Sequence, residues 1–449
     1  MTTTPSGRTT SIRRAEPRRP RTTATARRVA LVVALAALPG CGGDGGPPPQ
    51  QERVYVVGPE LENELGNIQD AFAQFEADTG IEVVVTGSSD FEERIVAQVA
   101  AGHPPDVALF PQPGLLLEFA DEVVPVPDEL AERMRRDFDA ERLRRVTLDD
   151  HLLGVPASAD MKSLVWYSPE AFAVGGYEAP RTLDRFEDMA ENMAALGRTP
   201  FCLGLESGVA TGWPLTDWIE DYLLRIEGPE VYDEWWEHEI PFDDPRVVAV
   251  AERVVDLLDR PGYVFGGFPQ SAERSSSEAG RPVLDGDCMM YRMAHFQGRD
   301  WPPGTEVGPD GDVNAFPLPG VTGDDDEPVA ALTGGIYAAG FSDRRAVQAT
   351  LEFIASEDFG EERATNGVGG FLSPHRGVDT DLYESGSDRF AAEQLAAADI
   401  VRFDATDLMP GPVGSNAVWD TMVDIAQGDV TVADAFAEIE RNWPAPAEE

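Results

Sequence analysis

Between residues 53 and 110, apolar residues follow two different spacings in turn. Short runs rich in valine predict β-strands at 53–58, 81–85 and 106–110. Between these runs, apolar side chains recur every three or four residues, as on one face of a helix: Ile68, Phe72 and Phe75, then Phe91, Ile95 and Val99. Gly80 and Gly102 follow and predict the helix ends. The order strand, helix, strand, helix, strand predicts an α/β lobe with a mostly parallel sheet flanked by helices.

Small and polar residues follow each of these strands, at Gly58-Pro59-Glu60, at Gly87-Ser88-Ser89-Asp90 and at Pro111-Gln112. Ligands of open α/β sheets lie beyond the carboxyl ends of the strands. These loops therefore predict room for a polar ligand, with Ser89 and Asp90 as candidate contacts. An N-cap of the next helix is the alternative role for Asp90.

The chain is expected to leave this sheet through an extended, alternating segment at 154–168. A longer section, more helical and rich in aromatic residues, continues to about residue 310. Strand-like patterns return at 312–319 and 331–340, and the rest of the chain has helical periodicity.

The N-terminal 40 residues have the composition of a secretory signal. Residues 1–28 contain eight arginines and one acid, and ten apolar residues follow at 29–38, too few for a spanning helix. The sequence Leu-Pro-Gly-Cys ending at Cys41 resembles a bacterial lipobox, which predicts lipidation of Cys41 and a Gly/Pro-rich tether over 41–53. The alternative is a cysteine that follows a signal peptide by coincidence, and the export route, Sec or twin-arginine, stays open.

Size and charge limit the remaining 409 residues. They are too many for one ordinary core and predict two lobes. They carry 27 basic and 80 acidic side chains, a net charge near −53, which excludes nucleic acid as a partner. The five histidines show no metal-binding spacing, so we expect neither a metal site nor a cofactor.

Two cysteines remain after Cys41. Outside the cytoplasm, a leftover pair favours a disulfide, so we expect Cys202 to pair with Cys288. Two separate buried thiols are the alternative.

Several segments resemble the extracellular solute-binding lipoproteins of sugar ABC transporters, and most closely the branch assigned to α-glucosides. They are LVWYSPEAF (164–172), GWPLTDWIEDYLLR (212–225), VNAFPLP (313–319), TGGIYAAGFSD (333–343) and DLMPGPVGS (407–415). The resemblance covers essentially all of 54–444.

The resemblance implies a two-lobed periplasmic-binding-protein-like fold. Each lobe would be a mostly parallel sheet flanked by helices, with hinge strands between the lobes and a sugar in the cleft. Lobe 1 would comprise 54–158 plus 333–368, and lobe 2 would comprise 162–330 plus 372–449. It further implies a monomer outside the cytoplasm, lipid-anchored to the outer face of the cytoplasmic membrane, that delivers sugar to permease subunits. A secreted glycoside hydrolase and a ligand-sensing lipoprotein are the alternatives.

Candidate ligand contacts follow from the chemistry of sugars, whose hydroxyls suit carboxylates and whose apolar faces suit aromatic rings. By the resemblance, Asp160 matches a ligand-contacting acid and Trp419 a stacking aromatic residue. Lys162 shares a face with Asp160 on an extended segment and is the only lysine of the chain. Glu206, Arg292 and Gly335 complete the candidates from strand ends and loops, with a surface salt bridge as the alternative for Arg292 and a plain turn for Gly335.

The stretch GWPLTDWIEDYLLR contains two tryptophans for which the helical pattern predicts different roles. Trp218, Tyr222 and Ile226 follow at intervals of four residues and predict a core stripe. Trp213 lies on another face at the helix entry, where Pro214 fits the first turn. We expect Trp213 to stack on the sugar and Asp217, one turn further along the helix, to accept a hydrogen bond from a sugar hydroxyl.

Overall fold

The structure is a computed structural model that describes residues 52–59, 63–324 and 327–444. The signal peptide, Cys41, Glu60 and nearly all of the tether lie outside these residues, so the predictions about them stay predictions. No helix in the described ranges is long and apolar enough to cross a membrane.

The first sheet contains the three strands expected from residues 53–110. β1 (Arg53–Gly58) pairs in parallel with β2 (Glu82–Gly87) and with β3 (Val107–Phe110). β13 (Tyr337–Gly340) pairs antiparallel with β3 and with β6 (Val155–Pro156), which gives the order β2-β1-β3-β13-β6. Valines of β1 and β2 are buried in one core with phenylalanines of the flanking helices.

Helices pack on this sheet where the apolar periodicity places them. They are α1 (Asn63–Ala71), α2 (Ala73–Thr79), α3 (Phe91–Ala100), α4 (Pro113–Leu117), α5 (Asp128–Asp137), α6 (Ala140–Arg144), α14 (Arg345–Ile354) and α15 (Glu357–Ala364), with a hairpin of β4 (Thr147–Leu148) and β5 (His151–Leu152). Gly80 ends α2 with a φ of 72°, as its position predicts.

The second sheet has the order β11-β8-β10-β9 and a separate core. Its strands are β8 (Leu164–Tyr167), β9 (Phe201–Cys202), β10 (Met290–Arg292) and β11 (Asn314–Pro317). The two-lobed α/β fold is confirmed, but the expectation of a mostly parallel sheet in each lobe is wrong, since two of the four pairings in the first sheet are antiparallel and the second sheet departs further. β8 pairs antiparallel with both β10 and β11, and only β9 and β10 are parallel. The strands of this sheet come from distant segments, whose directions local periodicity does not specify.

The helices of this part are more numerous, as the long helical section predicts. They are α7 (Pro169–Gly175), α8 (Leu183–Ala195), α9 (Trp213–Ile226), α10 (Gly228–Trp236), α11 (Pro245–Leu258), α12 (Pro282–Asp285), α13 (Gln297–Asp300), α16 (Gly386–Ala397), α17 (Ala405–Leu408), α18 (Val418–Gln427) and α19 (Val432–Arg441). Short 3₁₀ turns at Pro269–Glu273 and Thr380–Leu382 and a π-helical turn at Val413–Ala417 complete the chain.

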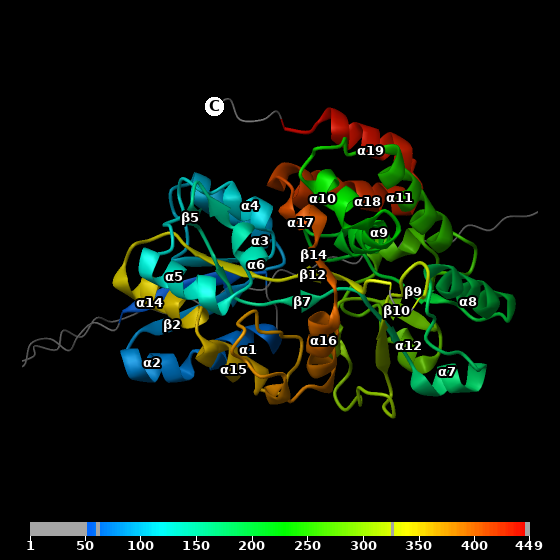
Figure 1. Cartoon of the computed structure of the whole chain (residues 1–449), viewed down its shortest axis with the longest axis horizontal. Helices are drawn as coiled ribbons and strands as arrows, with labels where there is room; N and C mark the ends of the chain where they lie inside the picture. Colours follow the sequence, from blue (N-terminus) through cyan, green and yellow to red (C-terminus); the bar gives the residue numbers. More distant parts are fainter. Residues whose placement is uncertain (1–51, 60–62, 325–326, 445–449) are drawn as a thin grey trace, which may run out of the picture. The chain divides into compact units, whose positions relative to one another are not determined.

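A small third sheet connects the two larger ones. β7 (Asp160–Met161) pairs antiparallel with β12 (Ala330–Gly334), which pairs in parallel with β14 (Ile400–Phe403). β7 lies between β6 and β8 in sequence, β12 leads directly into β13, and Ala159 forms a bridge with Leu372. In Figure 1, β7, β12 and β14 lie at the centre, with α2, α5 and α14 on one side and α7, α8 and β9 on the other.

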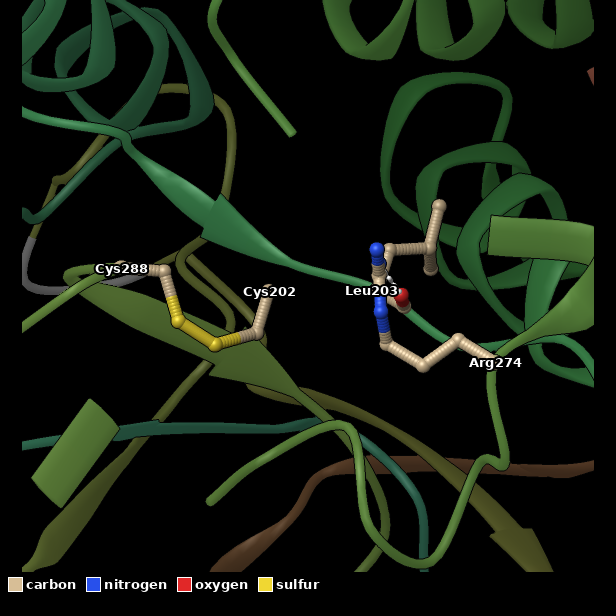
Figure 2. Close-up of a disulfide and its surroundings, with 4 residues drawn as sticks. All are labelled: Cys202, Leu203, Arg274 and Cys288. Atoms are coloured by element: carbon tan, nitrogen blue, oxygen red, sulfur yellow. Dashed lines mark hydrogen bonds between the residues drawn. A yellow bond between two sulfur atoms is a disulfide. The ribbon is translucent and has the colours of Figure 1, made fainter. Parts of the chain in front are cut away.

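Cys202 and Cys288 form a disulfide, the pair that the sequence predicts, with 5.5 Å between their Cα atoms. Figure 2 shows this disulfide at β9, with Arg274 beside Leu203. The Arg274 guanidinium donates to the Leu203 carbonyl oxygen over 2.6 Å. The disulfide and this hydrogen bond attach the two ends of the segment 274–288 to β9 and to Leu203, the residue that follows it.

Candidate functional site

A cavity of about 720 Å³ lies where the small central sheet meets the ends of the two larger sheets. Its volume falls within the range of small-molecule sites. It is lined by Pro59, Glu64, Ser89, Glu92, Pro111, Gln112, Ser158, Asp160, Lys162, Glu206, Ser207, Gly208, Ala210, Trp213, Ser275, Ser276, Ser277, Glu278, Met293, Phe296, Gln297, Arg299, Asp300, Gly335, Ile336, Gly370, Asp404, Asp407 and Trp419. The lining therefore combines carboxyl groups, hydroxyls, amides and aromatic rings.

Most of the residues proposed from the sequence line this one cavity. They are Ser89, Asp160, Lys162, Glu206, Trp213, Gly335 and Trp419. Three proposed residues, Asp90, Asp217 and Arg292, are not part of the lining. Asp90 is exposed at the N-cap position of α3, where its side chain makes no capping hydrogen bond.

Two glycines allow backbone segments to approach closely beside the cavity. Gly335 has a φ of 145°, and a Cβ there would lie 2.3 Å from the carbonyl oxygen of Ser158. Gly212, with a φ of 120°, brings the start of α9 against α18, since a Cβ there would lie 2.2 Å from the carbonyl oxygen of Trp419. A side chain at either position would force the backbones apart.

The two tryptophans of α9 have different surroundings, as their helical spacing predicts. Trp218 is fully buried and packs against Phe186, Phe201 and Tyr222, so its core role is confirmed. Trp213 is partly buried at the first position of α9 and lines the cavity. The Lys162 ammonium lies 5.4 Å from the centre of the Trp213 ring. Stacking of Trp213 on a ligand stays a prediction.

The role expected of Asp217 is wrong, because its carboxylate is fully buried behind the cavity. One oxygen accepts from Lys162 Nζ and the other from the Arg292 guanidinium, each over 3.0 Å. Arg292 is itself buried and also pairs with Asp221 over 3.0 Å. Arg292 therefore forms salt bridges, as the alternative proposed, but they are buried and not at the surface. Asp217 and Arg292 hold neighbouring groups in place and do not face the cavity.

Lys162 links three elements at the floor of the cavity. It follows β7, is 6% exposed, and its ammonium contacts Asp217 of α9 and Asp404 beside α17. Asp407 of α17 lies further away, at 3.8 Å. The other oxygen of Asp404 caps α17 by accepting from the Asp407 N–H over 3.0 Å. The single lysine thus neutralises carboxylates that would otherwise repel one another.

Sequence reasoning missed Asp404 and Asp407, both of which line the cavity. The only local signal is the Asp-x-x-Asp spacing before α17, which suits a capped helix start and carries no information about a binding site. Arg299 was missed as well. It forms a 2.7 Å salt bridge with Glu64 and donates to the Gly370 carbonyl oxygen over 3.1 Å.

Burial and charge shift the pKa values of these groups in opposite directions. Burial lowers the pKa of Lys162, but the charges of Asp217 and Asp404 outweigh it and raise that pKa well above the ordinary value. Burial likewise raises the pKa of Asp404, but Lys162 outweighs it and holds that pKa at about 2. For Asp160, burial outweighs the attraction of Lys162 and raises the pKa to about 6.

The sequence of this chain is similar to those of several known proteins. The profile of bacterial extracellular solute-binding proteins matches residues 58–359. The osmoprotective compounds-binding protein GgtB of Synechocystis sp. is 35% identical over 420 residues, 92% of this chain and 98% of that protein. The alpha-glucosides-binding periplasmic protein AglE of Rhizobium meliloti is 33% identical over 404 residues, 87% of each chain.

Solved structures resemble the fold at lower sequence identity. A chitin oligosaccharide binding protein aligns with a TM-score of 0.73 at 19% identity, over 87% of this chain and 98% of that one. Maltose-bound MalE3 of T. maritima aligns with a TM-score of 0.67 at 20% identity, again over 87% and 98%. At this level of identity the likeness shows the two-lobed fold alone.

The buried position of Lys162 predicts a large loss of stability on Lys162→Met. The substitution leaves Asp217 and Asp404 without their shared counter-charge, so we expect the free energy of unfolding to fall by about 3 to 5 kcal/mol. Urea denaturation followed by circular dichroism measures this change.

Arg185→Met is the matched control, since Arg185 pairs with Asp188 over 3.4 Å while both side chains are mostly exposed. It should cost less than about 1 kcal/mol. Equal losses for the two variants would show that the Lys162 contacts carry no special weight.

Proposed function

Because this chain belongs to the family of bacterial extracellular solute-binding proteins, we propose that it binds a sugar in the central cavity and delivers it to the permease of an ABC importer. The observation that carries the proposal is the composition of the cavity. Carboxyl groups and serine hydroxyls, which pair with sugar hydroxyls, line it together with the indoles of Trp213 and Trp419, which suit the apolar faces of sugar rings.

An α-glucoside or a short α-linked oligosaccharide is the substrate class that we propose. The printed names of two relatives support it, since AglE binds alpha-glucosides and GgtB binds osmoprotective compounds. Trp419 supports it as well, because its indole N–H is buried at the cavity without a hydrogen-bond partner in the described part of the chain. A sugar hydroxyl would satisfy this donor.

Closure of the lobes on the sugar is part of this proposal. In this proposal the chain would cross between 54–158 plus 333–368 and 162–330 plus 372–449 at β7, at β12 and near the bridge between Ala159 and Leu372. The salt bridge between Glu64 of α1 and Arg299 of α13 then joins the two lobes at the cavity. A hinge needs only a few residues that absorb the change in backbone angles.

Binding without catalysis is the role that we propose for the cavity. The matched relatives are named as binding proteins, which favours this role over the glycoside hydrolase alternative. We further propose that the chain acts outside the cytoplasm as a monomer, held to the membrane by a lipid on Cys41. Recovery of α-glucosides intact after long incubation with the protein would agree with the binding role, and their cleavage would refute it.

The two tryptophans provide a direct test of the proposed function. Isothermal calorimetry with maltose should show binding by the wild type, and Trp213→Ala should weaken it by at least about 2 kcal/mol, some 30-fold. The unfolding temperature of the free variant should barely change, because Trp213 is only partly buried.

Trp218→Ala is the matched control and should show the reverse. Loss of a fully buried indole should cost about 3 to 5 kcal/mol of stability. The proposal is refuted if neither maltose nor any other α-glucoside binds the wild type, or if Trp213→Ala binds normally.

The raised pKa of Asp160 predicts that sugar affinity depends on pH. An ionised carboxylate is the stronger hydrogen-bond acceptor, so affinity should fall as the pH drops through about 6, where Asp160 takes up a proton. Asp160→Asn should bind more weakly at pH 7.5 and remove most of this dependence. Calorimetry between pH 5 and 8 measures both effects, and an unchanged profile in the variant would contradict the role of Asp160.

A loss of protein stability through Asp160 would not explain such a fall in sugar affinity at low pH. The pKa of Asp160 is about 6 in the folded protein, above the ordinary value of 3.8, so the folded state binds this proton more tightly than the unfolded state. The contribution of Asp160 to the free energy of unfolding therefore rises as the pH falls from 6 towards 4.

A further inference from the structure

Acidic side chains far outnumber basic ones around the cavity. Eight carboxyl side chains line it, against the two cationic side chains of Lys162 and Arg299. A ligand group therefore meets mainly hydrogen-bond acceptors and negative charge. Whether the site accepts an anion depends on whether either cation is available to pair with it.

Neither cation is available without breaking an existing ion pair. Lys162 donates to Asp217 and Asp404, and both of these carboxylates are buried with it. Arg299 pairs with Glu64 over 2.7 Å and also donates to the Gly370 carbonyl oxygen. An anionic ligand that recruited either side chain would compete with these carboxylates for the cation, although Asp217 also pairs with Arg292 and Glu64 with Arg363.

Two buried amides add further acceptors. Gln112 donates through Nε2 to Glu92 over 3.2 Å, and Gln297 donates through Nε2 to the Ser277 carbonyl oxygen over 3.4 Å. Both partners are acceptors, and this fixes which end of each amide carries the nitrogen. The Oε1 atoms of both glutamines are buried without a hydrogen-bond partner in the described residues. Both residues line the cavity and are at most 4% exposed. Ligand hydroxyls would satisfy these oxygens, whereas a carboxylate or phosphate could not.

We infer that the site selects neutral, hydroxyl-rich saccharides and rejects saccharides that carry a carboxylate, phosphate or sulfate. This inference rests on the proposed function and adds a charge specificity to it. Like charges brought together in a partly desolvated site oppose binding strongly, so an acidic group should weaken affinity at least about 100-fold.

Maltitol and maltobionate provide a matched pair of probes. Both carry one glucose unit on an open six-carbon chain, and they differ only at the chain end, which is CH₂OH in maltitol and a carboxylate in maltobionate. Calorimetry at pH 7.5 with maltose, maltitol and maltobionate should show maltobionate binding at least about 100-fold more weakly than maltitol.

Substitution of single acidic residues distinguishes the effect of the cavity's charge on ligand selectivity from the effect of the charge of the whole chain. Glu278→Gln removes an exposed carboxylate that lines the cavity, so the ratio of maltitol to maltobionate affinity should fall several-fold. Glu170→Gln removes an exposed carboxylate of α7 outside the lining and should leave that ratio unchanged.

Four outcomes overturn the inference. Maltobionate that binds within tenfold of maltitol, or that binds when neither neutral sugar does, contradicts the charge selectivity directly. Equal changes of the ratio in Glu278→Gln and Glu170→Gln would assign the effect to overall charge and not to the cavity. Absence of binding by all three probes and by every other α-glucoside refutes the proposed α-glucoside function itself, and the inference fails with it.

Discussion

The ammonium of Lys162 holds together the parts of the chain that form the cavity floor. It contacts Asp217 of α9 and Asp404 beside α17, and it follows β7 of the small central sheet. Charges removed from water are costly unless they are paired. These carboxylates are buried together with counter-charges: Lys162 pairs with both, and Asp217 also pairs with Arg292. Lys162 thus joins α9 and α17 to the segment that follows β7 at the cavity wall.

The same contacts explain what the cavity offers to a ligand. Because Lys162 is occupied by carboxylates behind and beside it, its charge supports the site without being free to bind an anion. The indole of Trp213 lies over the ammonium at 5.4 Å, which positions the ring at the entry of α9. Asp160, two residues before Lys162, stays in the lining with a pKa raised by burial to about 6. Lys162 thus supports the cavity from behind, whereas Asp160 of the same extended segment lines it.

Features set by nearby residues could be predicted from the sequence, and features set by distant residues could not. The strands and helices of 53–110 and the different surroundings of Trp213 and Trp218 follow from spacing within a few turns. The partners of Lys162 do not, since Lys162 and Asp404 are 242 positions apart and no pattern joins them. Asp217 was misplaced for the same reason: its helical face was correct, but that face is covered by Lys162 and Arg292. The antiparallel pairing of β8 with β10 and β11 likewise depends on segments far apart in the chain.

Titration of Lys162 tests the central claim most directly, because it is the only lysine in the sequence. Protein labelled with ¹³C at lysine Cε gives one side-chain signal, whose chemical shift reports the charge of the ammonium. We predict that this signal shows no deprotonation up to pH 10.5, since Asp217 and Asp404 raise the pKa of Lys162 well above that value. We also predict that the signal shifts when maltose is added. A midpoint at or below pH 10.5, the ordinary value for an exposed lysine, would contradict the account.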